Sequence, residues 1–321
     1  MKILITGGGG FIGSHLVERL ILEGHKVNVL DDFSTGRIGN LRNVRESSSL
    51  TLINGSVLDL KLIHTAVKSV DYVFHLAAAV GVFNIVQNTL SSLVTNVTGT
   101  ENVLKAAHEN EKPFFLTSSS EVYGKNTANT LRETDDRILG SPSVLRWSYS
   151  EAKAIDESLT FAYFAEKGLQ ARIVRFFNTV GPRQVGSYGM VVPRFISSAL
   201  RDEPITIYGS GNQTRCFAHI YDVIDAVIQV AFSELTIGKV INIGNDFEIS
   251  MNDLARKIIA ETNSKSEIIH IPYEKAYGEG FEDMERRVPN IELINQLVGW
   301  KPQRDLSTII ADISAEMNTR R

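Results

Sequence analysis

The sequence is poor in the features that mark secreted, membrane-spanning and nucleic-acid-binding proteins. Cys216 is its single cysteine, which excludes an intrachain disulfide and a cluster of thiolate metal ligands. The sequence contains no run of about 18 apolar residues, the length that a helix needs to cross a bilayer. Met1–Ile5 enters a strand pattern at once and lacks the apolar core of a signal peptide. The formal net charge of -4 gives no reason to expect nucleic acid or an anionic membrane as partner. We therefore expect a cytoplasmic protein without a metal site.

Length and composition are those of an ordinary globular chain. The 321 residues, 43% of them hydrophobic and 22% charged, suffice for one large domain and a smaller one. The sequence shows neither an internal repeat nor a low-complexity linker.

A glycine-rich turn stands near the start of the chain. Residues 2–6 form a short apolar run, and apolar residues at helical spacing follow from Ser14 onward. Glycines between a strand and a helix permit a tight turn and a close backbone approach, so that free N–H groups at the helix start can hold a pyrophosphate. The pattern predicts a dinucleotide site at Gly7, Gly10, Phe11, Ile12 and Gly13.

The next two strands predict how such a dinucleotide would be held. Residues 26–30 form a strand that ends in Asp31 and Asp32, and an acidic residue there can accept hydrogen bonds from a ribose and repel a ribose phosphate. We favour this role over a simple turn, which makes NAD the expected cofactor. Residues 71–79 form a buried strand that ends in small residues such as Ala77, against which a cofactor can lie flat. His75 in this strand is interpreted as packed and structural.

Two later segments carry candidate catalytic groups. Residues 113–124 read as a strand that delivers Ser119, Ser120 and Glu121 to the sheet edge where ligands bind. Tyr149 and Lys153 are four residues apart at the start of a helix and so share one face. A nearby ammonium favours the phenolate, which can then take a proton from a hydroxyl while a hydride leaves. By itself, the pair also fits a packed ring and a solvated lysine.

The order and spacing of these segments resemble the extended short-chain dehydrogenases/reductases. The resemblance implies a doubly wound parallel sheet (a Rossmann fold) with a smaller α/β carboxyl-terminal substrate domain. We expect residues 1–179 to bind NAD, with 206–249 returning to that domain, and 180–205 with 250–321 to bind a nucleotide sugar. The resemblance also suggests that Asn96 bonds main chain near the active site, although an ordinary helix start is an equal alternative.

The second half of the chain resembles the nucleotide-sugar epimerases, dehydratases and decarboxylases. Asn178 lies in a strand and loop at 172–183, and Val192, Tyr208 and Arg215 follow in segments at 191–195 and 207–217. In this group, Asn178 and Arg215 match positions that bind the diphosphate, and Val192 and Tyr208 match a uracil pocket. Residues 277–289 and 145–149 resemble UDP-glucuronate decarboxylases, which implies that Arg287 lies near the sugar, although it could serve the diphosphate alone.

The resemblance implies a shared first step, in which Tyr149 takes the proton of the sugar 4-hydroxyl and NAD takes the hydride. Dehydratases have an Asp-Glu pair where this chain has Ser120 and Glu121, which argues against 4,6-dehydration. We therefore expect decarboxylation of UDP-glucuronate. A UDP-hexose 4-epimerase acting on UDP-glucose, UDP-glucuronate or UDP-N-acetylglucosamine is the alternative, and a dehydratase or 5-epimerase is a weaker one. The helices near 98–109 and 150–167 carry apolar residues on more than one face, and in this family such helices pair into a dimer interface. The resemblance therefore implies a homodimer, with simple burial in the monomer as the alternative.

Overall fold

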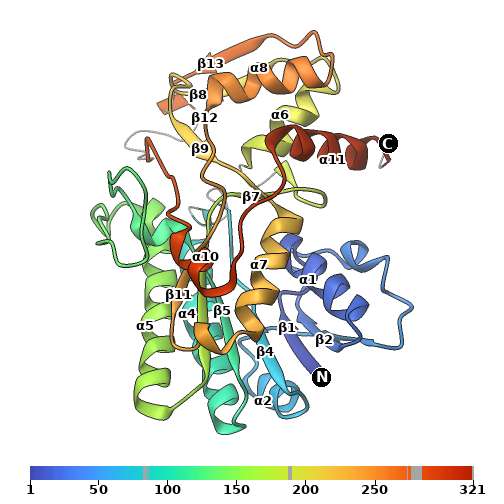
Figure 1. Cartoon of the computed structure of the whole chain (residues 1–321), viewed down its shortest axis with the longest axis vertical. Coiled ribbons are helices and arrows are strands. Elements are labelled where there is room, and N and C mark those ends of the chain that lie inside the picture. The colour runs from blue at the N-terminus through green and yellow to red at the C-terminus, as the bar shows by residue number, and fades with distance from the viewer. Residues whose placement is uncertain (82–84, 86, 187–189, 273, 276–283, 320–321) are drawn as a thin grey trace.

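The computed structural model describes residues 1–81, 85, 87–186, 190–272, 274–275 and 284–319. A large lobe contains the central sheet and most of the helices, and a smaller lobe lies over one end of that sheet (Figure 1). Within these ranges, no helix combines the length and the apolar character needed to cross a membrane.

The central sheet has seven strands in the order β11-β6-β5-β4-β1-β2-β3, all parallel. The chain winds outward from β1 in both directions, so the carboxyl ends of β1 and β4 form the switch point where ligands bind in such sheets. This arrangement confirms the predicted doubly wound fold. The strands are β1 (Lys2–Thr6), β2 (Lys26–Asp31), β3 (Leu50–Asn54), β4 (Tyr72–His75), β5 (Phe114–Ser119), β6 (Ala171–Phe176) and β11 (Val240–Ile243).

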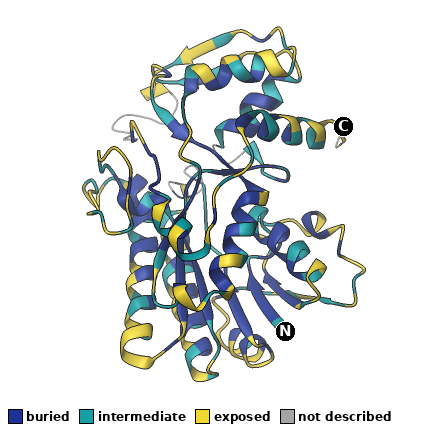
Figure 2. Cartoon of the chain, viewed as in Figure 1, coloured by how far each residue is buried: buried dark blue, intermediate teal, exposed yellow. Residues whose placement is uncertain are grey.

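Alternation along the strands gives the sheet two apolar faces. Ile3 and Ile5 of β1 belong to one buried cluster, whereas Leu4 between them belongs to another. Figure 2 shows the strands buried between the two layers of helices. The first cluster includes α1 (Phe11–Leu22) and α7 (Ile220–Phe232), and the second includes α2 (Leu60–Lys68), α4 (Thr89–Glu109) and the inner side of α5 (Ser148–Lys167).

The smaller lobe has its own apolar core, in which Val192, Phe195, Leu254 and Ile309 are fully or nearly fully buried. Its helices are α6 (Val191–Ala199), α8 (Met251–Glu261) and α11 (Leu306–Thr319), and its strands pair as β8 (Ile205–Tyr208) with β13 (Ile268–Ile271) and β9 (Thr214–Cys216) with β12 (Glu248–Ser250). The remaining short elements are η1 (Ile38–Leu41), η2 (Ser120–Tyr123), η3 (Leu145–Trp147), β7 (Thr179–Val180), β10 (Ala218–His219), η5 (Glu234–Thr236) and α10 (Glu292–Val298).

The cores depart from the predicted domain boundaries at two places. Within 206–249, α7 and β11 join the large lobe, but Ile207 and Phe217 are buried in the core of the smaller one. Within 250–321, Ile294 and Trp300 are buried in the core of the large lobe. The Trp300 indole donates a hydrogen bond to the Asp222 carbonyl of α7 at 3.0 Å, which holds this segment against the large lobe. Apolar side chains, rather than position in the sequence, decide where each segment packs.

Candidate active site

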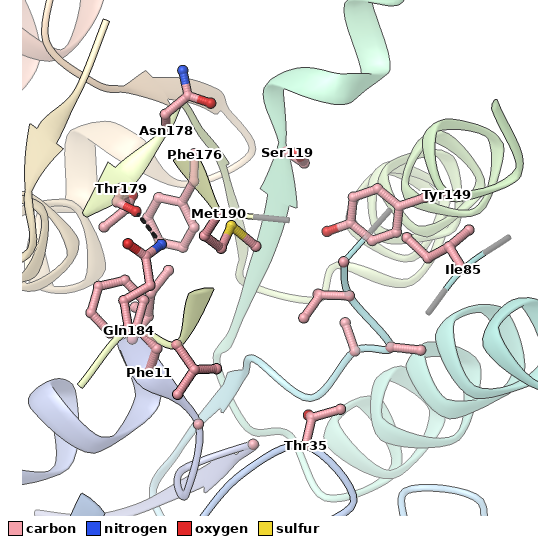
Figure 3. Close-up of a pocket in the computed structure, with 18 of the residues that line it drawn as sticks. Phe11, Thr35, Ile85, Ser119, Tyr149, Phe176, Asn178, Thr179, Gln184 and Met190 are labelled. Atoms are coloured by element: carbon pink, nitrogen blue, oxygen red, sulfur yellow. Dashed lines mark hydrogen bonds between the residues drawn. The ribbon is translucent and has the colours of Figure 1, made fainter. Parts of the chain in front are cut away.

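A cavity of about 800 Å³ runs from the glycine turn to the junction of the two lobes. It opens at the carboxyl ends of the parallel strands, where the fold predicts a ligand. Figure 3 shows Tyr149 projecting into it from α5, with Ser119 at the end of β5 and Met190 across the space. Of the predicted site residues, the cavity is lined by Gly7, Gly10, Phe11, Ile12, Gly13, Asp31, Asp32, Ala77, Ser119, Ser120, Glu121, Tyr149, Lys153, Asn178, Val192, Tyr208, Arg215 and Arg287.

The glycine turn forms the floor of this cavity and leaves no room for side chains. Gly7 has a φ of 74°, in the region that favours glycine, and a Cβ there would lie 2.6 Å from the Ala77 nitrogen. A Cβ on Gly13 would lie 2.2 Å from the Gly7 carbonyl oxygen. Gly10 occupies the N-cap of α1 and has no side chain to shield the first amides of the helix. The turn therefore presents bare backbone N–H groups, which suits a pyrophosphate.

Asp31 fastens this turn and also faces the cavity. Its carboxylate accepts hydrogen bonds from the Gly9 and Phe33 amides, both at 2.8 Å. Burial raises the pKa of Asp31, and the two amides oppose that rise. The neighbouring Asp32 is exposed and bonds Ser34. Asp31 is thus the buried acidic group beside the glycine turn, in the place predicted for a ribose contact.

Asn96 does not line the cavity but supports its wall. Its side chain accepts a hydrogen bond from the Ala79 amide at 2.7 Å and donates one to the Ala79 carbonyl at 3.2 Å. Ala79 itself lines the cavity. His75 bonds Thr6 and Thr100, and burial lowers its pKa to about 3, which agrees with a structural role. Asn96 therefore acts on the site only by tying down the segment after β4.

Tyr149 and Lys153 share one face of α5, as their spacing predicts. The Lys153 ammonium lies 3.1 Å from Asp156. Burial raises the pKa of Tyr149, Lys153 lowers it, and Glu121 and Asp156 raise it further. Ser119 lowers the pKa of Tyr149 as well. The predicted effect of Lys153 is present, but burial outweighs it, so the pKa of Tyr149 stays above its ordinary value.

Glu121 is enclosed by two arginines. One carboxylate oxygen lies 2.7 Å from Nη1 of Arg146 and the other 2.6 Å from Nη1 of Arg287. Burial alone would raise the pKa of Glu121, but the two guanidinium groups outweigh burial and hold that pKa well below its usual range. Glu121 is therefore a fixed anion and a poor proton donor. The sequence marked Glu121 as a candidate catalytic group but did not reveal that two cations 25 and 166 residues away meet it.

The predicted substrate residues lie where the two lobes meet. The Asn178 amide donates to the Cys216 carbonyl at 3.0 Å and accepts from Arg287 at 3.4 Å. Arg215 is buried, and its guanidinium donates to the Thr214 carbonyl at 2.8 Å. Val192 is fully buried. The arrangement places an amide and two arginines along one wall of the cavity.

Two arginines of the cavity wall were not predicted. Arg146 stands three residues before Tyr149, in a segment whose resemblance to decarboxylases was the available signal. Arg194 lies 4.4 Å over the ring of Tyr208, and its signal was its place in the segment 191–195, which resembles the nucleotide-sugar enzymes. Both line the cavity.

Arg287 is carried by a segment that both lobes hold. Thr214 of β9 donates to the Glu285 carbonyl at 3.0 Å. On the other side, Leu131 donates to the Val288 carbonyl at 2.8 Å. We call residues 284–290 the Arg287 segment. Residues 276–283, which contributed to the resemblance, lie outside the described part of the chain.

The sequence matches known proteins over almost its whole length. The family described as GDP-mannose 4,6 dehydratase matches residues 4–313. The UDP-N-acetyl-alpha-D-glucosaminuronate decarboxylase of Bacillus cytotoxicus is 41% identical over 302 residues, which cover 94% of this chain and 92% of that protein. The UDP-glucuronic acid decarboxylase 1 of Xenopus tropicalis is 36% identical over 301 residues, which cover 94% and 68%.

Solved structures of similar proteins have the same fold. A UDP-glucuronic acid 4-epimerase from Bacillus cereus, in complex with UDP-glucuronic acid and NAD, matches with a TM-score of 0.90 at 26% identity and covers 100% of both chains. Pal from Bacillus thuringiensis matches with a TM-score of 0.91 at 28% identity, again over 100% of both chains. The site geometry and these matches agree with the predicted resemblance. The chain belongs to the GDP-mannose 4,6 dehydratase family of extended short-chain dehydrogenases/reductases, a family of nucleotide-sugar enzymes.

Proposed function

We propose that this enzyme uses NAD to decarboxylate a UDP-linked uronate, with UDP-glucuronate as the first substrate to test. The observation that carries the proposal is the enclosure of Glu121 by Arg146 and Arg287 beside Tyr149. The guanidinium groups of Arg146 and Arg287 therefore stand together at this part of the cavity. Guanidinium groups bind carboxylates with paired hydrogen bonds, and a uronate carries a carboxylate that a neutral hexose lacks.

The cavity floor fits NAD. The bare amides of the glycine turn suit the pyrophosphate, and Asp31 suits an unphosphorylated ribose. Bound NAD supplies the acceptor that takes a hydride from carbon 4 of the sugar and gives it back at the end of the cycle. NAD-dependent relatives and the chemistry of this floor both support this choice of cofactor.

Tyr149 and its neighbours perform the acid–base work of the reaction. The Tyr149 oxygen takes the proton of the 4-hydroxyl, Ser119 orients that oxygen, and the Lys153 ammonium favours the phenolate. The resulting ketone lies β to the carboxylate. When the bond between carbons 5 and 6 breaks, carbon dioxide leaves and the ketone takes up the electron pair. Carbon 5 then gains a proton, and Tyr149 returns its proton to the 4-oxygen.

A product assay distinguishes this proposal from 4-epimerisation. The purified protein with NAD is given UDP-glucuronate, UDP-N-acetylglucosaminuronate or UDP-glucose in separate reactions, and the products are identified by mass spectrometry and NMR. We expect carbon dioxide and a UDP-pentose, or its N-acetylamino counterpart, from an acidic substrate. An isomer of unchanged mass would overturn the proposal. Epimerisation is the second candidate because the Bacillus cereus neighbour with UDP-glucuronic acid is a 4-epimerase.

Replacing Arg287 with leucine should lower kcat/KM for the acidic substrate about 10- to 100-fold, because hydrogen bonds to charged groups contribute roughly 1.5–3 kcal/mol. The variant removes one of the two guanidinium groups that contact Glu121. Arg286→Leu is the matched control, because its side chain is 41% exposed and pairs with Glu248 instead. Steady-state rates of the two variants test this directly. Equal losses in both would contradict a specific role for Arg287.

We also infer a cytoplasmic homodimer. Leu90 and Val94 of α4 and Ile155 of α5 are 77%, 42% and 44% exposed, and the two helices pack against each other on one face of the sheet. Light scattering should give twice the 35.5 kDa mass of the chain, and Ile155→Arg should give the single mass. The control variant Leu22→Arg alters an exposed leucine of α1 on the other face of the sheet, and this protein should remain dimeric. A monomeric wild-type protein would refute the inference.

The single, buried Cys216 suits a reducing compartment.

A further inference from the structure

The ammonium of Lys153 has a buried carboxylate as its direct neighbour. Asp156 lies three residues further along α5, and its Oδ2 atom is 3.1 Å from the Lys153 nitrogen. The exposed fraction is 3% for the Lys153 side chain and 0% for the Asp156 side chain. Where solvent is largely excluded, a charge at this distance is weakly screened. The Lys153 ammonium, which favours the phenolate of Tyr149, is therefore also paired with the Asp156 carboxylate.

The other charged groups nearby already have partners. Glu157 of α5 accepts hydrogen bonds from Arg175 of β6 at 2.9 and 2.7 Å and from Ser118 of β5 at 2.5 Å. Glu121 of η2 is held by Arg146 of η3 and by Arg287.

The described residues of α4 and β4 that pack against Asp156 bring no further charge. From α4, the Thr100 hydroxyl contacts the Asp156 carboxylate, and burial keeps His75 of β4 neutral by lowering its pKa to about 3. Asp156 is thus the anion that faces Lys153 at hydrogen-bond distance.

We propose that Asp156 is a positioning residue that holds the Lys153 ammonium and offsets part of its charge at the Tyr149 oxygen. This rests on the proposed function in one respect, the need for Tyr149 to take a proton and later return it. A lysine without Asp156 would favour the phenolate more strongly and so make it a weaker base, which hinders uptake of the hydroxyl proton and helps its return. Proton transfer in both directions is best served by a group of intermediate acidity. Asp156 supplies that balance.

The ionisation of Tyr149 can be measured without any sugar substrate. Phenolate absorbance is followed against pH for the protein with NAD, and the same titration of Tyr149→Phe is subtracted. We expect Asp156→Asn to move the Tyr149 titration to lower pH by about one pH unit, the lower end of the effect of a neighbouring charge. Lys153→Met should move it the other way. An unchanged or higher titration in Asp156→Asn would overturn the proposal.

A second readout uses turnover. Because the phenolate is the form that takes the proton, the rise of kcat with pH follows the titration of Tyr149. Asp156→Asn should therefore reach its plateau rate about one pH unit lower than the wild-type enzyme. Loss of activity with an unchanged pH profile would indicate a merely structural role and refute the proposal.

Two controls complete the design. Near-UV circular dichroism verifies that the isosteric Asp156→Asn variant folds, and Asp156→Ser takes its place if it does not. The product assay on the wild-type enzyme decides the proposed function separately. An epimerase result there, together with a shifted Tyr149 titration here, would leave Asp156 in its role.

Discussion

Replacing Tyr149 with phenylalanine should lower kcat by about 10²- to 10⁴-fold, the usual contribution of a positioned acid–base group. The variant removes only the hydroxyl of Tyr149, which projects into the cavity. Lys153 and the glycine turn remain, so NAD content should stay unchanged. Single-turnover reduction of bound NAD by the substrate measures the affected step. Because burial raises the pKa of Tyr149, the wild-type rate should also climb as the pH rises toward that pKa.

Tyr123→Phe is the matched control for this experiment. Tyr123 is fully buried, donates a hydrogen bond to Asn242 at 2.8 Å, and has its pKa raised to about 12 by burial. Its loss should cost about 1 kcal/mol of stability, the net value of one hydrogen bond, and leave the chemistry intact. If Tyr149→Phe retained a rate near that of Tyr123→Phe, another group would have to be the base.

Replacing Gly13 with alanine should abolish NAD binding. The new Cβ would lie 2.2 Å from the Gly7 carbonyl oxygen and 2.8 Å from the Gly8 Cα. Both contacts are with backbone, which cannot rotate away, so the turn must widen at a cost of up to about 3 kcal/mol. The Gly7 carbonyl also accepts the Gly10 amide at 3.1 Å, and this closure would be lost.

Two measurements check this result. NAD released from the denatured protein is quantified, and thermal unfolding is followed with and without added NAD. Gly39→Ala is the control, because a Cβ there meets nothing within 4 Å and its φ is ordinary. We expect the control to retain its cofactor. A Gly13→Ala protein with full NAD occupancy would show that the turn is not the pyrophosphate site.

The sequence predicted best where function depends on local pattern. The glycine turn, the strand ending in Asp31 and the pair Tyr149 and Lys153 are each contained in one short segment. Period and spacing suffice to place such residues at the carboxyl edge of a parallel sheet. The structure brings them to one cavity, as the pattern predicted.

The sequence predicted least where function depends on contacts between distant segments. Arg146 and Arg287 meet at Glu121 although they lie far apart in the chain. No local period reveals that contact, so the sequence marked Glu121 as a candidate catalytic group without showing its two partners. Asp156 shares a helix with Lys153 at a spacing common to many surface ion pairs. Only the burial of Asp156 and Lys153 distinguishes this pair from a surface ion pair.

The Arg287 segment limits how the two lobes can separate. One lobe holds it at Glu285 and the other at Val288, and the three residues between these carbonyls span at most about 10 Å when fully extended. The segment is thus a short tether placed at the sugar end. A separation of the two lobes beyond this span would have to break the hydrogen bond at the Glu285 carbonyl or the one at the Val288 carbonyl. Arg287 can therefore keep its place beside Glu121 only while the two lobes stay together.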